Sequence, residues 1–252
     1  MKKLILLLLL VCALLGEGCG PNSPDCFQAS GELERVQLEV AEFSSITVFE
    51  NIQLVLRYGP QQEVVLETGK NLRSDISAEV VEGTLELRDS NSCNYFRSYG
   101  KTIFYVTTPD LRVLRSSTGW PIRSEGVLPF SDLRLVSESF NNAEAETTDG
   151  SFDLEVDVER LSIVSNGIAY FKLSGQAAAF SITIAAGDSR VDAMDLASET
   201  VQVSHRGSND ISVRPRERIS GLINGYGDVL SYERPPEVMV EETFRGRLIF
   251  ID

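Results

Sequence analysis

His205 is the only histidine of the chain, and it lies between Ser204 and Arg206. A hydrolase with a Ser-His-Asp triad needs these groups to converge from separate loops, which adjacency in the sequence does not provide. The segment 201–210, VQVSHRGSND, has the pattern of a strand that runs into a turn. We therefore predict that His205 is a solvated turn residue and not a catalytic base.

Carboxylates are the second candidate for chemistry, because the chain has 37 Asp and Glu against 23 Lys and Arg. A pair of carboxylates can hydrolyse a glycosidic bond, and Asp153, Glu155 and Asp157 are close in sequence. Their spacing of two also places all three on one face of a strand. With so many acidic residues, a solvated strand face is the favoured interpretation.

Calcium is a further possibility, because Asp188, Asp192 and Asp195 follow a glycine turn and calcium prefers oxygen ligands. The segment lacks the Gly-Gly-x-Gly-x-Asp repetition of calcium-loaded β-rolls. We predict a charged structural turn, and with it no metal, no cofactor and no catalytic residue. The formal net charge of -14 also argues against nucleic acid, which requires clustered Lys and Arg.

Two places could contact a ligand. Trp120, the only tryptophan, follows Thr118-Gly119, and an exposed ring there could stack on a sugar or a partner protein, or it could cap the edge of the fold. The polar stretch 140–147 begins with Phe140, Asn141 and Asn142 and lengthens one interval of the repeat described next. Such insertions project from a repeat fold, so it is a candidate contact surface.

The elements that must position these residues repeat about every 20 residues. Short alternating apolar runs are each followed by a turn with Gly or Asn, which predicts strands of about five residues and turns with positive φ. No long helical pattern intervenes, so the chain should form a stack of β-coils. The runs begin at Leu111, Leu133, Leu161, Phe180, Val201 and Ile219.

The first half of the chain is also predicted to be all-β, with longer strands in hairpins or wide coils. Turn sequences such as Tyr58-Gly59-Pro60 separate the expected strands. These strands cover residues 46–48, 52–56, 64–66, 76–80, 85–87 and 103–106.

The N-terminus has the pattern of an export signal. Lys2 and Lys3 precede an apolar run, 4–15, that is too short to span a bilayer. Gly18 directly precedes Cys19, as at the cleavage site of bacterial lipoproteins, although Gly16 and Glu17 depart from the usual lipobox. We predict a signal peptide at 1–18 and lipidation of Cys19, with ordinary signal-peptidase cleavage as the alternative.

Cys26 and Cys93 are the two cysteines that remain after Cys12, within the signal, and Cys19. Cysteine pairs in exported proteins are usually oxidised. A metal site would need more ligands than this pair and one histidine offer. We predict a Cys26–Cys93 disulfide, with residues 19–42 as a linker and disulfide segment ahead of a domain at 43–252.

Residues 43–252 resemble the GIN domain, the head domain of "putative auto-transporter adhesins", in its exported lipoprotein type. The type also pairs a Cys-Phe-x-x-x-Gly opening, here 26–31, with a Cys-Asn-x-x-Arg-Ser segment, here 93–98, which supports the disulfide. The matching residues are Phe43, Ile46, Val48, Ile52, Leu54, Leu56, Gly69-Lys70-Asn71-Leu72, Glu79-Val80, Gly83-Thr84-Leu85, Thr108-Pro109-Asp110-Leu111, Gly225, Gly227-Asp228-Val229, Tyr232 and Pro235.

The resemblance implies a right-handed parallel β-helix-like solenoid and a role at the cell envelope. The leading hypothesis is a non-enzymatic envelope lipoprotein that is anchored by lipid to the outer membrane and binds a surface protein or a glycan. The alternatives are a polysaccharide-active enzyme on a β-helix scaffold and a structural protein of the periplasm.

Overall fold

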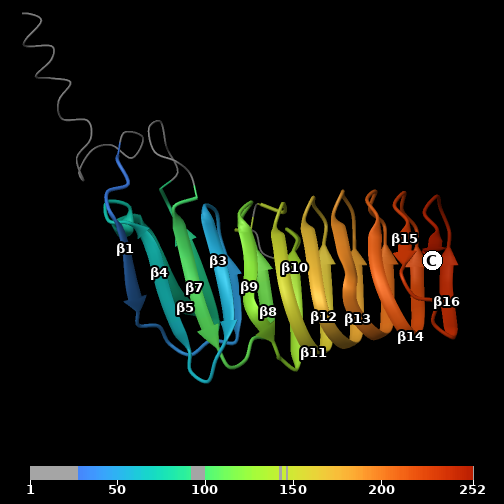
Figure 1. Cartoon of the computed structure of the whole chain (residues 1–252). Coiled ribbons are helices and arrows are strands. Elements are labelled where there is room, and N and C mark those ends of the chain that lie inside the picture. Colours follow the sequence, from blue (N-terminus) through green and yellow to red (C-terminus); the bar gives the residue numbers. More distant parts are fainter. Residues whose placement is uncertain (1–27, 92–99, 142–143, 146, 252) are drawn as a thin grey trace, which may run out of the picture.

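The computed structural model describes residues 28–91, 100–141, 144–145 and 147–251. The all-β prediction is confirmed: these residues form strands joined in one hydrogen-bonded network, with one short 3-10 helix, η2 (Arg73–Asp75). Figure 1 shows the strands side by side along one axis. The strands of the first part are β1 (Leu33–Leu38), β2 (Ser45–Val48), β3 (Ile52–Tyr58), β4 (Glu63–Gly69), β5 (Ile76–Val81), β6 (Thr84–Asp89), β7 (Thr102–Thr108), β8 (Val113–Ser116) and β9 (Pro121–Leu128). Those of the second part are β10 (Asp132–Ser137), β11 (Ser151–Ser165), β12 (Tyr170–Ile184), β13 (Arg190–His205), β14 (Ile211–Ile223), β15 (Val229–Ser231), β16 (Glu237–Glu242) and β17 (Leu248–Phe250).

Strands β10 to β14 pair in parallel, each with the next along the chain. The predicted repeat sets their register, because the first residues of five of the six apolar runs are direct neighbours across the strands. The run from Leu111 is displaced by one residue, since Arg134 lies opposite Val113. We call such a set of residues, which lie side by side on successive strands, a column. This column consists of Leu133, Leu161, Phe180, Val201 and Ile219, and all five side chains are buried.

The strands of the second part are longer than the five residues expected from the repeat. β11 runs from Ser151 to Ser165 and stays paired with β12 along most of that length. Two consecutive exposed residues, Glu159 and Arg160, interrupt its alternation of buried and exposed positions. We call this interruption the corner, because the buried residues on both of its sides, such as Val156 and Leu161, belong to one hydrophobic core.

The first part combines parallel and antiparallel pairs. β5 and β6 form an antiparallel hairpin, and β4 pairs antiparallel with both β1 and β7. β2 and β3 are parallel to β8 and β9, which in turn pair with β10 and β11. The two parts therefore form one continuous stack.

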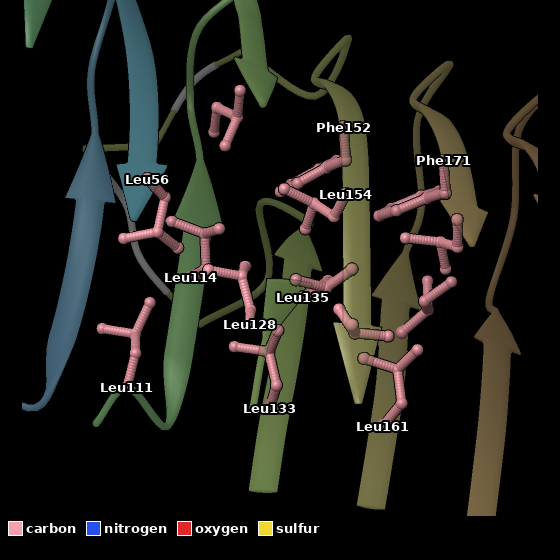
Figure 2. Close-up of a cluster of buried hydrophobic side chains, with 14 of the residues drawn as sticks. Leu56, Leu111, Leu114, Leu128, Leu133, Leu135, Phe152, Leu154, Leu161 and Phe171 are labelled. Atoms are coloured by element: carbon pink, nitrogen blue, oxygen red, sulfur yellow. The ribbon is translucent and has the colours of Figure 1, made fainter. Parts of the chain in front are cut away.

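One apolar interior runs the length of this stack. Figure 2 shows side chains of neighbouring strands meeting in layers, with Phe152 above Leu154 and Phe171 beside them. The rings of Phe152 and Phe171 are parallel, with centroids 4.8 Å apart and an interplanar angle of 7°. Identical positions of successive coils thus stack on each other, and each buried ring contributes about 2–3 kcal/mol of transfer free energy.

The glycines of the turns are needed mainly for close approach, which corrects the expectation of positive φ. Of Gly167, Gly187, Gly207 and Gly225, only Gly187 has a positive φ, 83°. A Cβ atom on Gly225 would lie 2.3 Å from the carbonyl oxygen of Gly207 in the preceding coil. A side chain at this position would therefore push neighbouring coils apart.

Candidate functional site

His205 is buried, so the prediction of a solvated turn residue is wrong. Its side chain has no exposed surface and lies in a column between Ile184 and Ile223. The reason is register: position 205 continues the inward alternation of β13 up to the last residue of the strand. The backbone N–H of Gly207 donates to Nδ1 at 3.4 Å, and Nε2 has no hydrogen-bond partner among the described residues.

The surroundings of His205 keep the imidazole neutral. Burial away from water lowers its pKa, and the Asn209 carbonyl and the carboxylates of Asp210 and Asp228 offset this only in part. Because the ring is closed off from solvent, it has no access to a substrate. His205 is a packing residue of the turn edge.

The other sequence candidates for chemistry lie on the surface. Asp153, Glu155 and Asp157 are exposed along β11, as the strand-face interpretation predicts, and Lys172 is 3.4 Å from Asp153. Among the described residues, no group of three or more His, Cys, Asp or Glu is arranged to hold a metal ion.

Trp120 lies half-buried at the start of β9. A Cβ atom on Gly100 would lie 2.7–2.8 Å from the edge of the indole ring, so the ring covers that glycine. The Trp120 backbone N–H donates to Oγ1 of the buried Thr118 at 3.2 Å. This position favours the cap interpretation.

The insertion in the repeat is the connection from β10 to β11, residues 138–150. The next connection, from β11 to β12, is much shorter and consists of residues 166–169. Phe140 is 66% exposed on it and Asn141 is also exposed. Asn142 lies outside the described residues, as do Cys19, Cys26 and Cys93. Phe140 is therefore exposed on the insertion, and its role as a ligand contact stays a prediction.

Glu138 anchors the start of this insertion. Its side chain is 1% exposed and lies 3.0 Å from the guanidinium of Arg115. The backbone N–H groups of Phe140 and Asn141 donate to Oε2 at 2.6 and 3.3 Å. Burial raises the pKa of Glu138, but the hydrogen bonds from Phe140 and Arg115 outweigh this and hold it below its usual value.

A groove of about 510 Å³ crosses β10 to β14 beside the corner. Its polar lining comes from two outward columns. One contains Asp132, Arg160, Ala179, Thr200 and Arg218, and the other contains Arg134, Ser162, Ser181, Gln202 and Ser220. We call the second set the polar column.

The side chains of the polar column have no partner among the described residues. None of its five side chains makes a hydrogen bond or ion pair with another residue in the described part of the chain. The charged residues of the first column are already in ion pairs. Arg160 donates to Asp132 at 2.6 Å, and Arg218 lies 2.6 Å from Glu237, its neighbour on β16. The hydrogen bond from Arg160 also lowers the pKa of the Asp132 carboxyl.

Comparison with protein families decides what this fold is. The family model "Putative auto-transporter adhesin, head GIN domain" matches residues 42–235. The chain belongs to this family. No curated protein matches the chain.

Solved structures agree on the GIN-domain fold. A "putative adhesin" from Bacteroides fragilis has a TM-score of 0.75 at 20% identity, covering 87% of this chain and 97% of its own. A "putative adhesin" from Parabacteroides distasonis has a TM-score of 0.62 at 14% identity, covering 88% and 98%. A "putative lipid binding protein" from the same organism has a TM-score of 0.59 at 14% identity, with the same coverage. At these identities the likeness concerns the fold.

Sequence reasoning missed the polar column of this GIN domain, although the repeat contains it. The second residue of the runs LRLVS, LSIVS, FSITI, VQVSH and ISGLI is Arg, Ser, Ser, Gln and Ser. Aligning the runs would have placed these five residues in one column.

In the part of the chain that the structure describes, no helix has the length and apolarity of a membrane span.

Proposed function

We propose that this GIN domain is a non-enzymatic binding module of the bacterial cell envelope whose groove recognises a glycan. The observation that carries the proposal is the polar column, which offers hydroxyl, amide and guanidinium groups that no neighbouring side chain uses. Sugars are bound through hydrogen bonds from such groups. Polysaccharide hydrolysis needs two carboxylates, and Asp132, the only carboxylate in the groove lining, already pairs with Arg160.

The scaffold in this proposal is a right-handed parallel β-helix-like solenoid over residues 43–252. The parallel pairing of successive strands supports it, because crossovers between parallel strands are right-handed in about 98% of cases. The leader 1–18, the lipid anchor on Cys19 and the Cys26–Cys93 disulfide remain part of the proposal. Together they would tether the stack to the envelope, on the outer membrane, through the segment 19–42.

Location is tested by protease shaving of intact cells together with mass analysis of the mature N-terminus. Acylated Cys19 and cleavage by external protease are the expected results. Protection of the protein in intact cells would contradict a surface role and favour the alternative of a periplasmic structural protein.

The groove is tested by filling it. Ser181→Tyr places a large side chain in the middle of the polar column and should abolish glycan binding. Thr183→Tyr is the matched control, because Thr183 faces outward on the same strand and does not line the groove. Binding that survives Ser181→Tyr would refute the groove as the recognition site.

A further inference from the structure

The charge of the groove is opposite to that of the whole protein. The chain has a formal net charge of -14, yet the groove lining contains four arginines and one carboxylate. Arg160 and Arg218 are held by carboxylates. Arg112 forms a long ion pair with Asp110, at 3.8 Å, and its charge also acts on Asp132, whereas Arg134 pairs with no described residue. The guanidinium of Arg134 therefore remains for a ligand at the β10 end of the groove, with the loosely paired Arg112 also in the groove lining.

We propose that the groove binds a linear acidic polysaccharide, with a carboxylate of the polymer on Arg134 and Arg112 and its hydroxyl groups along Ser162, Ser181, Gln202 and Ser220. This inference rests on the proposed function and specifies its ligand class. A guanidinium offers two parallel N–H donors that match the two oxygens of a carboxylate. The serine hydroxyls and the Gln202 amide can each donate and accept, as sugar hydroxyls do.

The dimensions of the groove suit an extended polymer. Neighbouring strands are spaced by about 4.8 Å, so the four intervals from β10 to β14 span roughly 19 Å. The polar column provides one side chain per strand along this distance. A single small ligand would leave most of these groups unused, whereas a chain of several sugars engages them in succession.

A polypeptide ligand fits this groove less well. Extended peptides bind by adding a strand at a free sheet edge, but β11, β12 and β13 are paired on both sides. Interfaces between proteins are enriched in exposed aromatic side chains. The only aromatic residue of the groove lining, Phe180, is 2% exposed and points into the core.

The acidic remainder of the protein restricts where such a polymer can bind. At about 0.15 M salt the Debye length is about 8 Å, so charges beyond the groove are largely screened while contacts within it persist. At low salt the net charge of -14 repels the polymer as a whole. Binding should therefore strengthen from about 0.01 to about 0.15 M salt, opposite to a basic patch, whose affinity only falls.

The test compares polygalacturonate with the same polymer after full methyl esterification, which keeps the backbone and removes the charge. The purified protein should bind polygalacturonate at least about fivefold more tightly, as expected for one charge-assisted contact worth about 1 kcal/mol. Arg134→Gln should remove most of that difference. Arg123→Gln is the matched control, because Arg123 is exposed on the neighbouring strand β9 and lies outside the groove.

The outcomes separate the ligand class from the function. If both polymers bind equally, Arg134→Gln has no effect and Ser181→Tyr abolishes binding, the acidic ligand is refuted while the glycan groove stands. If Ser181→Tyr leaves the binding of both polymers intact, the groove itself is refuted. Equal or tighter binding of poly-L-glutamate would replace the polysaccharide by an acidic polypeptide. Failure of the wild-type protein to bind polygalacturonate would overturn the inference outright.

Discussion

Replacement of Gly225 by alanine tests whether the turn glycines are selected by close approach. The added Cβ would lie 2.3 Å from the Gly207 carbonyl oxygen, and ordinary contact begins at 3.4 Å. The two coils would have to separate by about 1 Å at this point. The same oxygen accepts hydrogen bonds from Tyr226 N–H at 2.9 Å and Gly227 N–H at 3.2 Å, and both would lengthen beyond bonding distance.

The expected loss of stability follows from these contacts. Overpacking costs about 1–3 kcal/mol, and each lost hydrogen bond adds about 1 kcal/mol, so Gly225→Ala should destabilise by about 3–5 kcal/mol. For a domain of this size that lowers Tm by roughly 6–20 °C. Without the clash, alanine at a φ that it can adopt would stabilise by about 0.4–1 kcal/mol through the unfolded state. A close contact at Gly225 therefore predicts that Gly225→Ala lowers the stability, whereas a glycine without this contact predicts that it raises the stability.

Urea and thermal unfolding, followed by circular dichroism, measure the effect. Gly83→Ala is the control: Gly83 has a φ of 75° and an added Cβ meets nothing within 4 Å, so only backbone strain of about 1–2 kcal/mol is expected. An unchanged or raised stability of Gly225→Ala would refute the close-approach argument.

The other predictions concern buried polar groups and the candidate contacts. Folding lowers the pKa of His205, so on acidification the unfolded chain binds a proton before the folded protein does. The free energy of unfolding should therefore be highest above pH 7 and fall as the pH drops below about 6.5, by at most about 1.4 kcal/mol per pH unit. Denaturant titrations of His205→Leu at several pH values should show no such pH dependence. The variant should also be as stable as the wild type at pH 7, because a leucine suits the neighbouring isoleucines of the column. If the pH dependence persists, other groups cause it. Glu138→Ala removes the carboxylate from Arg115, which keeps its hydrogen bond to the backbone carbonyl of residue 138, and should destabilise by about 3 kcal/mol, the lower end for a broken buried ion pair. Replacing both residues, Arg115 by Met and Glu138 by Leu, should cost less stability, and equal losses in the two variants would contradict a buried ion pair. Trp120→Ala should lower Tm without weakening glycan binding if the ring is a cap, and calorimetry with binding assays would reveal the reverse pattern of a recognition residue.

The sequence predicts the pairing of the strands well where each strand repeats the same pattern of apolar residues. Leu133, Leu161, Phe180, Val201 and Ile219 are apolar because each covers the one before it, so aligning the runs predicts their register. The corner could not be predicted in this way. Its exposed pair Glu159-Arg160 has the pattern of a strand end, yet the backbone remains paired across it.

The candidate site was harder to predict, because its signal is a comparison between repeats. His205 has a polar side chain in a turn-rich segment, and only its alignment with Ile184 and Ile223 shows that it points inward. Ser162, Ser181 and Gln202 are ordinary outward residues of single strands. They become a surface feature only when the strands are stacked, and their freedom from other partners depends on side chains contributed by neighbouring coils.

This division between inward and outward columns explains how the family keeps its fold at low identity. Inward positions need apolar side chains of suitable size, and turn positions need glycine where coils approach, which leaves the outward residues unconstrained by stacking. Structures at 14–20% identity accordingly share the fold over 87–88% of this chain. If the proposed binding function holds, its specificity should reside in the outward columns. In this chain the column from Arg134 to Ser220 is an outward column whose side chains have no partner among the described residues, so it is where the proposed function predicts the ligand contacts.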